Sequence, residues 1–156
     1  MSSMAAVRRL IGASAFLWAL GWAGQAHAQL GVGTTWLRTD PQGKGIVLSV
    51  EACCNGGLRL IWQIPPMGGQ PASTMTVDSP MNGTEVPVLI AGKPSGETMA
   101  IKRVDDHHYS AIVKMNGQPF GTSNGTVSAD NRTMTVDSAF GVGSQPQKTT
   151  ETWVRK

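Results

Sequence analysis

The two cysteines of this chain, Cys53 and Cys54, are adjacent, and their thiols are the most reactive side chains in the sequence. A disulfide between neighbours would close a small ring across one peptide bond, whose Cα atoms lie about 3.8 Å apart, whereas disulfides normally join Cα atoms about 4.4–6.8 Å apart. Such a bridge is strained and readily reduced. Asn55-Gly56-Gly57 follows directly and predicts a hairpin tip. Three interpretations stay open: a disulfide within the pair, thiols that are unpaired or bonded to a second molecule, and metal or redox chemistry.

His107-His108 follows Asp105-Asp106, so four side chains of types that bind metal ions stand together. Adjacent residues of a strand point to opposite faces, which keeps two neighbouring histidines from sharing one ion. Zinc also needs three or four converging ligands, and beyond the N-terminal segment the chain has no further histidine. We therefore predict a polar turn here and no metal site.

Catalytic chemistry has little support in the sequence. Beyond the N-terminal segment, the two neighbouring histidines are the only imidazole bases available to activate a serine. A glycine-rich piece at 141–143 lacks the lysine and the following helix of a phosphate-binding loop. Carboxylates could meet in space as an acid–base pair, although their spacing does not predict it: Asp78, Glu85, Glu97, Asp130, Asp137 and Glu151. We predict no enzymatic activity and no cofactor.

The residues before Gln29 have the three parts of a cleavable signal peptide. Arg8 and Arg9 form its positive start, an apolar run covers 10–20, and Ala26-His27-Ala28 places small residues at the cleavage site. Residues 1–28 are therefore the predicted signal peptide, and residues 29–156 form one predicted domain in the periplasm or outside the cell. No later segment is apolar enough for stable membrane insertion.

The charge of the chain is mostly a property of this leader. Removing Arg8 and Arg9 from the 13 basic residues leaves 11 against 10 acidic residues, a net charge near +1 instead of +3. A nearly neutral chain gives no reason to expect a nucleic-acid partner. The oligomeric state is not indicated.

Beyond Ala28 the chain lacks a sustained helical period, and short β-favouring runs alternate with turn signals about every eight to twelve positions. This pattern is typical of an all-β sandwich or barrel. Asn116-Gly117 predicts a two-residue hairpin because both central positions of a type I′ turn need positive φ. Prolines at 65–71 predict a loop. The expected strands cover 34–38, 46–52, 58–64, 72–78, 85–89, 98–104, 108–115, 119–127, 133–140 and 149–155.

From Val77 to its end the chain resembles a group of small exported bacterial proteins that have a lipocalin-like β-barrel and no established activity. The resemblance rests on these pieces: Asn82-Gly83, Pro87-Val88, Gly92-Lys93-Pro94, 99–105, 114–118 and 127–136. It implies fold and not activity. Gly33-Thr34-Thr35-Trp36 is similar to the glycine-then-tryptophan opening of such barrels, which implies that Trp36 closes one end with Arg155 over its ring. An ordinary core role for Trp36 is the alternative.

Alternation along the expected strands predicts one apolar face. Methionines on that face could line an adaptable cavity, because unbranched thioether side chains repack around irregular ligands. Tyr109 is a candidate to orient the polar head of a ligand. A filled interior with methionine as packing material is the alternative. The predicted cavity wall consists of Trp62, Met99, Ile101, Tyr109, Val113, Met115, Phe120 and Met134.

We thus expect a single antiparallel, lipocalin-like barrel or curved meander of about 8–10 strands. The expected function is non-catalytic binding of a small apolar or amphipathic molecule in an exported protein. One alternative is a structural or interaction protein with a filled barrel that binds a partner through loops or a sheet edge. Another is a small exported redox factor that uses Cys53 and Cys54.

Overall fold

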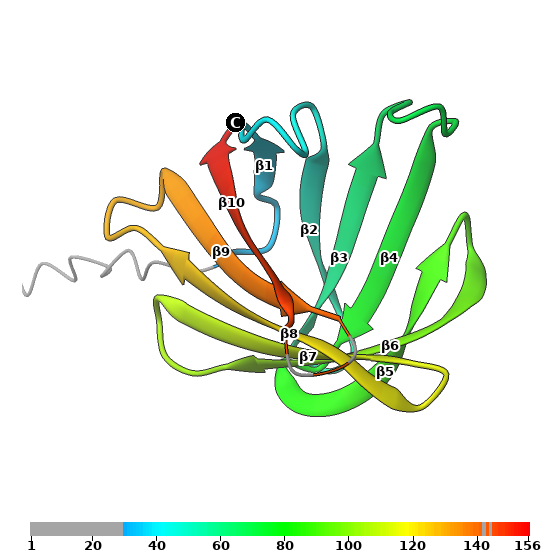
Figure 1. Ribbon diagram of the computed structural model, residues 1–156. Helices are drawn as coiled ribbons and strands as arrows, with labels where there is room; N and C mark the ends of the chain where they lie inside the picture. The colour runs from blue at the N-terminus through cyan, green and yellow to red at the C-terminus, as the bar shows by residue number, and fades with distance from the viewer. Residues whose placement is uncertain (1–29, 142, 144) are drawn as a thin grey trace, which may run out of the picture.

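Ten antiparallel strands close into one barrel in the computed structural model, which describes residues 30–141, 143 and 145–156 (Figure 1). Each strand pairs with its neighbour in the chain, and β1 closes the barrel against β10. The prediction of an all-β antiparallel barrel is confirmed. The predicted signal peptide, residues 1–28, and the predicted first mature residue, Gln29, lie outside the described residues, as does the middle residue of the glycine-rich piece at 141–143. Within the described part of the chain no helix is long and apolar enough to cross a membrane.

All the expected strands are present, and most of their ends shift by at most two residues. The strands expected at 85–89 and 98–104 begin earlier, at Asn82 and Lys93. The strands are β1 (Thr35–Arg38), β2 (Val47–Cys53), β3 (Gly57–Ile64), β4 (Ser73–Ser79), β5 (Asn82–Ile90), β6 (Lys93–Arg103), β7 (His108–Met115), β8 (Gln118–Val127), β9 (Thr133–Phe140) and β10 (Gln147–Arg155). β7 and β9 have the predicted bounds. The loop predicted at 65–71 lies between β3 and β4 and contains an isolated bridge from Met67 to Gln70.

Two segments of turn-like composition, Asn82-Gly83 and Lys93-Pro94, lie inside strands and do not form reversals. Asn82-Gly83 begins β5, and Lys93-Pro94 begins β6, so the turn between these strands is Ala91-Gly92. The register between β5 and β6 shifts twice, which means that extra residues are accommodated as bulges. Glycine and proline are tolerated at such irregular places, and their turn-like composition therefore misled the prediction.

The Asn116-Gly117 turn is confirmed. Its two central residues have φ values of 48° and 78°, and the flanking residues Met115 and Gln118 are paired. These are the positive angles that a type I′ turn requires, and its twist matches that of the strands it joins. This turn holds β7 and β8 in register.

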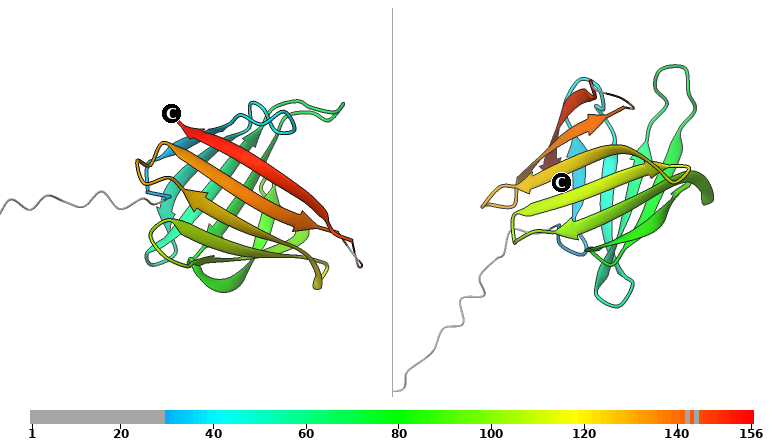
Figure 2. Two further views of the ribbon diagram at one scale, coloured as in Figure 1. Left: turned by 60° about the vertical axis from the view of Figure 1, so that its left-hand side comes forward. Right: turned by 60° about the horizontal axis from the view of Figure 1, so that its bottom comes forward.

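Buried apolar side chains form the core on the inside of the barrel. Figure 2 shows the course of the barrel strands from two further sides. Apolar residues alternate with exposed ones along most strands, so one face of each strand packs inward. Trp36 of β1 and Val77 of β4 have no solvent exposure. The buried apolar residues that form one cluster are Leu30, Trp36, Ile46, Leu48, Val50, Leu58, Leu60, Val77, Met81, Val88, Ile101, Tyr109, Val127, Met134 and Trp153.

Candidate functional site

A cavity of about 210 Å³ lies within the barrel. Its wall is mostly apolar, and the polar side chains that reach it are the exception. The lining residues come from the inward faces of most strands and from the segment before β1: Leu30, Leu48, Leu60, Trp62, Met75, Met99, Ile101, Tyr109, Ser110, Ala111, Val113, Ser123, Gly125, Met134, Val136, Ser138, Phe140, Glu151 and Trp153.

Most of the predicted wall residues line this one cavity. They are Trp62, Met99, Ile101, Tyr109, Val113 and Met134. Sequence alternation found them because an apolar residue at every second position must face the interior of a barrel that has water outside.

Met115 and Phe120 do not line the cavity, so their assignment is corrected. Met115 is the last residue of β7, beside the hairpin turn, and it is 37% exposed. In the pairing of β7 with β8, Val113 is opposite Gly121 and Lys114 is opposite Pro119, which leaves Phe120 as the extra residue of a bulge. The polar residues that follow Phe120 carry no apolar alternation, so the sequence offered no signal for which face is inside.

Phe120 packs instead against Phe140, with ring centroids 5.9 Å apart. Gly121 makes room for this arrangement, because a Cβ at that position would overlap the ring of Phe140. Phe140 itself reaches the cavity wall. An aromatic pair thus braces the wall near the bulge.

A carboxylate, Glu151, is the charged side chain of the cavity wall. Its Oε1 lies 2.9 Å from Nη1 of Arg38, and its Oε2 accepts a hydrogen bond of 3.0 Å from the indole nitrogen of Trp153. Arg38 also binds both carboxylate oxygens of Asp40, at 2.6 and 3.0 Å. A Cβ on Gly43 would overlap the guanidinium of Arg38, so the glycine leaves the space that this side chain occupies.

The pKa values of the two carboxyl groups move in opposite directions. Hydrogen bonds from Arg38 hold the pKa of Asp40 below its ordinary value. Burial raises the pKa of Glu151, against the opposing effects of Arg38 and the Trp153 hydrogen bond. With both carboxylates ionised, one guanidinium faces two negative charges. The cluster of Arg38, Asp40 and Glu151 then carries one net negative charge, and Glu151 is its member that lines the cavity.

Glu151 is the functional candidate that the prediction of wall residues missed. It was named only among carboxylates that could meet in space. A signal was present, however, because Glu151 stands two positions before Trp153, on the parity of β10 that faces inward.

The expected closure by Trp36 and Arg155 is also corrected. These residues are direct partners across β1 and β10, but the side chain of Arg155 is exposed, and the indole of Trp36 donates to the hydroxyl of Thr34 at 3.0 Å. The described guanidinium–indole contact joins Arg38 and Trp153, at 5.9 Å from the ring centroid. In this contact β1 supplies the arginine and β10 supplies the tryptophan, which is the reverse of the expected arrangement.

The hydroxyl oxygen of Tyr109 already has a hydrogen-bond donor within the chain. It accepts a hydrogen bond of 2.8 Å from the backbone nitrogen of Leu30, although the ring of Tyr109 lines the cavity. This bond ties the segment before β1 to β7. The hydroxyl thus has a structural partner, and Glu151 is the better candidate for head recognition.

Gly121-Thr122-Ser123-Asn124-Gly125 has the Gly-x-Ser-x-Gly spacing of a nucleophile elbow. An elbow places its serine on a sharp turn between a strand and a helix, whereas Ser123 lies in the middle of β8. Its hydroxyl forms a hydrogen bond of 2.8 Å with the hydroxyl of Ser138, and both serines line the cavity. The spacing here reflects strand alternation and not a catalytic turn.

The polar cluster at the start of β7 is a turn. Asp105 Oδ1 accepts the backbone N–H groups of His107 and His108, each at 2.8 Å, and it lies 2.7 Å from Nδ1 of His108. The ring of His107 is turned to the carbonyl of Val127 at 3.1 Å. The two imidazoles have different partners, as expected for a polar turn.

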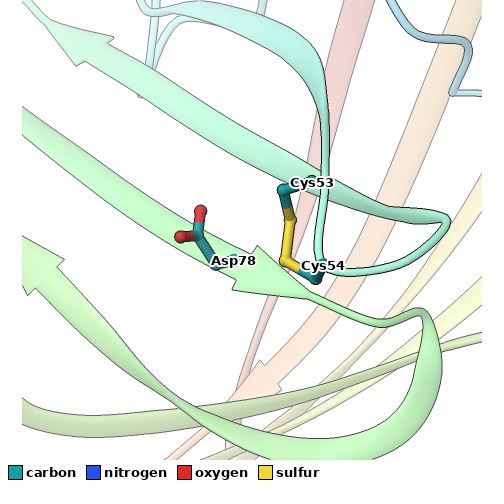
Figure 3. Close-up of side chains that lie close together, drawn as sticks. All are labelled: Cys53, Cys54 and Asp78. Carbon is teal, nitrogen blue, oxygen red and sulfur yellow. A yellow bond between two sulfur atoms is a disulfide. The ribbon is translucent and has the colours of Figure 1, made fainter.

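The adjacent cysteines form a disulfide at the end of the β2–β3 hairpin, and no free cysteine occurs. Asp78 of β4 lies beside them (Figure 3). The sequence did not predict that Asp78 lies beside the cysteines, because β4 is far from them along the chain.

Fold and cavity together define a closed antiparallel β-barrel with a partly open, mostly apolar cavity. Comparisons with protein-family models, with curated proteins and with solved structures found no match.

Proposed function

We propose that this protein is exported and binds a small amphipathic molecule inside its barrel without catalytic turnover. The observation that carries the proposal is the apolar cavity with one charged lining residue, Glu151, which pairs with Arg38 as Asp40 does. Export is supported by the signal-peptide pattern before Gln29 and by a disulfide, which persists in oxidising compartments.

The size of the cavity limits the ligand. Its volume is about 210 Å³. An apolar cavity of roughly 150 Å³ holds benzene, whereas pockets for drug-sized molecules have about 300–1,000 Å³. The expected ligand is therefore a molecule of one ring or a short branched chain, with its apolar part against Met75, Met99 and Met134.

Charge selects the head of the ligand. Glu151 carries one of two carboxylates that share Arg38, so a positive or hydrogen-bond-donating head relieves the surplus negative charge. A carboxylate head would add a third negative charge to the cluster, which is unfavourable. The cavity thus favours an amine-bearing ligand over an acid of the same size.

Calorimetric titration with three molecules of matched shape tests this proposal. We expect benzylammonium to bind more tightly than toluene, and benzoate to bind most weakly, at pH 7. Glu151→Gln should weaken benzylammonium binding by about tenfold, which corresponds to about 1.4 kcal/mol, and leave toluene binding nearly unchanged. Tighter binding of benzoate, or binding of none of the three, would overturn the proposal.

Gly125 allows the cavity itself to be tested. A Cβ there would lie 3.8 Å from atoms of Tyr109 and Val136, an ordinary contact, so a side chain can be added without a clash at its root. Gly125→Ala should weaken toluene binding modestly and Gly125→Val should weaken it strongly, because the new atoms occupy the cavity. Thr126→Val is the matched control, because Thr126 is exposed on the other face of β8. Equal effects of Gly125→Val and Thr126→Val on toluene affinity would place the ligand elsewhere.

A further inference from the structure

We propose that the hairpin tip between β2 and β3, once its disulfide is reduced, binds a soft divalent cation through the sulfur atoms of Cys53 and Cys54 and a carboxylate oxygen of Asp78. One potential ligand atom from each of these residues lies within 4.8 Å of the others. The cation site is on the outer face of the barrel and is independent of the cavity function.

The turn gives the two sulfurs a common side. Neighbouring residues in a regular strand point to opposite faces, but Cys54 has a φ of 54° and Asn55 a φ of 53°, so the chain leaves the strand geometry at the second cysteine. Figure 3 shows the linked sulfurs and the carboxylate of Asp78 turned toward the same space. Cys54 is exposed, so a reductant and an ion can both reach the tip.

The third ligand comes from β4, which runs close beside the tip. Gly57 permits this approach, because a Cβ there would overlap the carbonyl oxygen of Ser79. Asp78 is held in place by Arg59, whose Nε and Nη2 lie 2.7 and 2.8 Å from its two oxygens. An aspartate carboxylate paired with a guanidinium is ionised at neutral pH. Each oxygen retains a lone pair for a metal ion.

Two thiolates and one carboxylate suit zinc or cadmium. Zinc takes sulfur ligands at about 2.3 Å and carboxylate oxygens at about 2.0–2.2 Å in tetrahedral sites, and a water molecule would supply the fourth position. Thiolate ligands favour soft ions over magnesium or calcium. Two thiolates and one carboxylate carry three negative charges, and with Arg59 beside Asp78 the net charge of the site is two negative, which balances a divalent cation.

Reduction is required because the bonded sulfurs have no thiolate to offer. A dithiol reductant transfers two electrons: one of its thiolates attacks a cysteine sulfur, the S–S bond breaks, and closure of the reductant into its own disulfide releases both cysteines as thiols with two protons. Binding of the cation then displaces these two protons to solvent. Adjacent cysteines hold their Cα atoms 3.8 Å apart, below the usual range for disulfides, which favours reduction.

Titration of the full mature chain with Cd²⁺, followed by the sulfur-to-cadmium charge-transfer absorbance, tests this site. We expect one Cd²⁺ per chain after anaerobic reduction with a phosphine and no charge-transfer band for the disulfide form. A ratio of one ion to two chains, or the same band before reduction, would overturn the proposal.

Substitutions separate a ligand from a structural role for Asp78. Asp78→Asn should weaken Cd²⁺ binding at least tenfold. Glu51→Gln is the control and should not change it, because Glu51 of β2 lies in the same cross-strand row as Arg59 and Asp78 but is not a proposed ligand. Arg59→Gln breaks the same ion pair but leaves the carboxylate, so it should retain or tighten binding. If Arg59→Gln and Asp78→Asn weaken binding equally, or if neither does, Asp78 is not a ligand.

Discussion

Arg38 is the side chain on which the polar end of the cavity depends. It pairs with Asp40 at 2.6 Å and with Glu151 at 2.9 Å, and it lies over the ring of Trp153. One residue thus joins β1, the following loop and β10, where the barrel closes. Without Arg38, the carboxylates of Asp40 and Glu151 would be poorly solvated and would lose their cationic partner.

We expect Arg38→Met to lower the free energy of unfolding by roughly 2–4 kcal/mol, since breaking a buried pair costs about 3–5 kcal/mol and these groups keep some exposure. Urea unfolding measures the change. Arg59→Met is the matched control: its pair with Asp78 is exposed by 45% and 42%, so the loss should be under about 1 kcal/mol. Equal losses in the two variants would contradict the assigned role of Arg38.

The sequence predicts for some residues, but not for others, whether the side chain faces the inside of the barrel. Trp62, Met99 and Met134 could be placed inside from alternation, because each stands in a strand with a clear apolar parity. Phe120 could not, because a bulge shifts the register at that residue and the neighbours are polar. The pairing of Arg38 with Glu151 joins the first and last strands, and no local pattern specifies it.

At the scale of elements, hairpins determine the order of the strands. Consecutive strands pair throughout, which is the outcome expected when each turn is short and each connection local. The strands themselves were predictable, because turn residues interrupt the β-favouring runs at regular distances. The bulges in β5, β6 and β8 were not, since they arise from pairing with a neighbour and not from the residues alone.

The Asn116-Gly117 turn gives a prediction at this scale. Gly117 has a φ of 78°, so Gly117→Ala should lower the free energy of unfolding by about 1 kcal/mol through backbone strain. Gly125→Ala is the control, because Gly125 lies in β8 with ordinary space for a Cβ and should change stability little. Thermal unfolding of both variants measures the difference. A larger loss at Gly125 would show that the turn does not need its glycine.

For the whole molecule, the carboxyl groups predict a stability maximum in mildly acidic solution. The folded pKa of Glu151 is raised by burial, so the folded state binds more protons between the ordinary value of 4.5 and that raised value, and stability falls as pH rises through this window. The folded pKa of Asp40 is lowered by Arg38, so its contribution is present above the ordinary value of 3.8 and is lost as pH falls through the folded pKa.

Urea unfolding at a series of pH values measures both effects. Glu151→Gln should abolish the gain in stability on moving from neutral to mildly acidic pH, and Asp40→Asn should reduce the loss in strong acid. The two variants act in different pH windows because the shifts have opposite signs. An unchanged pH profile in both would contradict the assigned protonation behaviour.

If the barrel interior is a ligand site, as we propose, the methionine methyl groups report on it directly. Met75, Met99 and Met134 line the cavity, whereas Met115 is partly exposed at the end of β7 and Met81 is buried outside the lining. NMR spectra of protein labelled with ¹³C at the methionine methyls should be recorded during titration with toluene and benzylammonium. We predict that the signals of Met75, Met99 and Met134 shift and saturate while those of Met115 and Met81 stay. Unmoved signals from the three lining residues at saturating ligand would contradict the account.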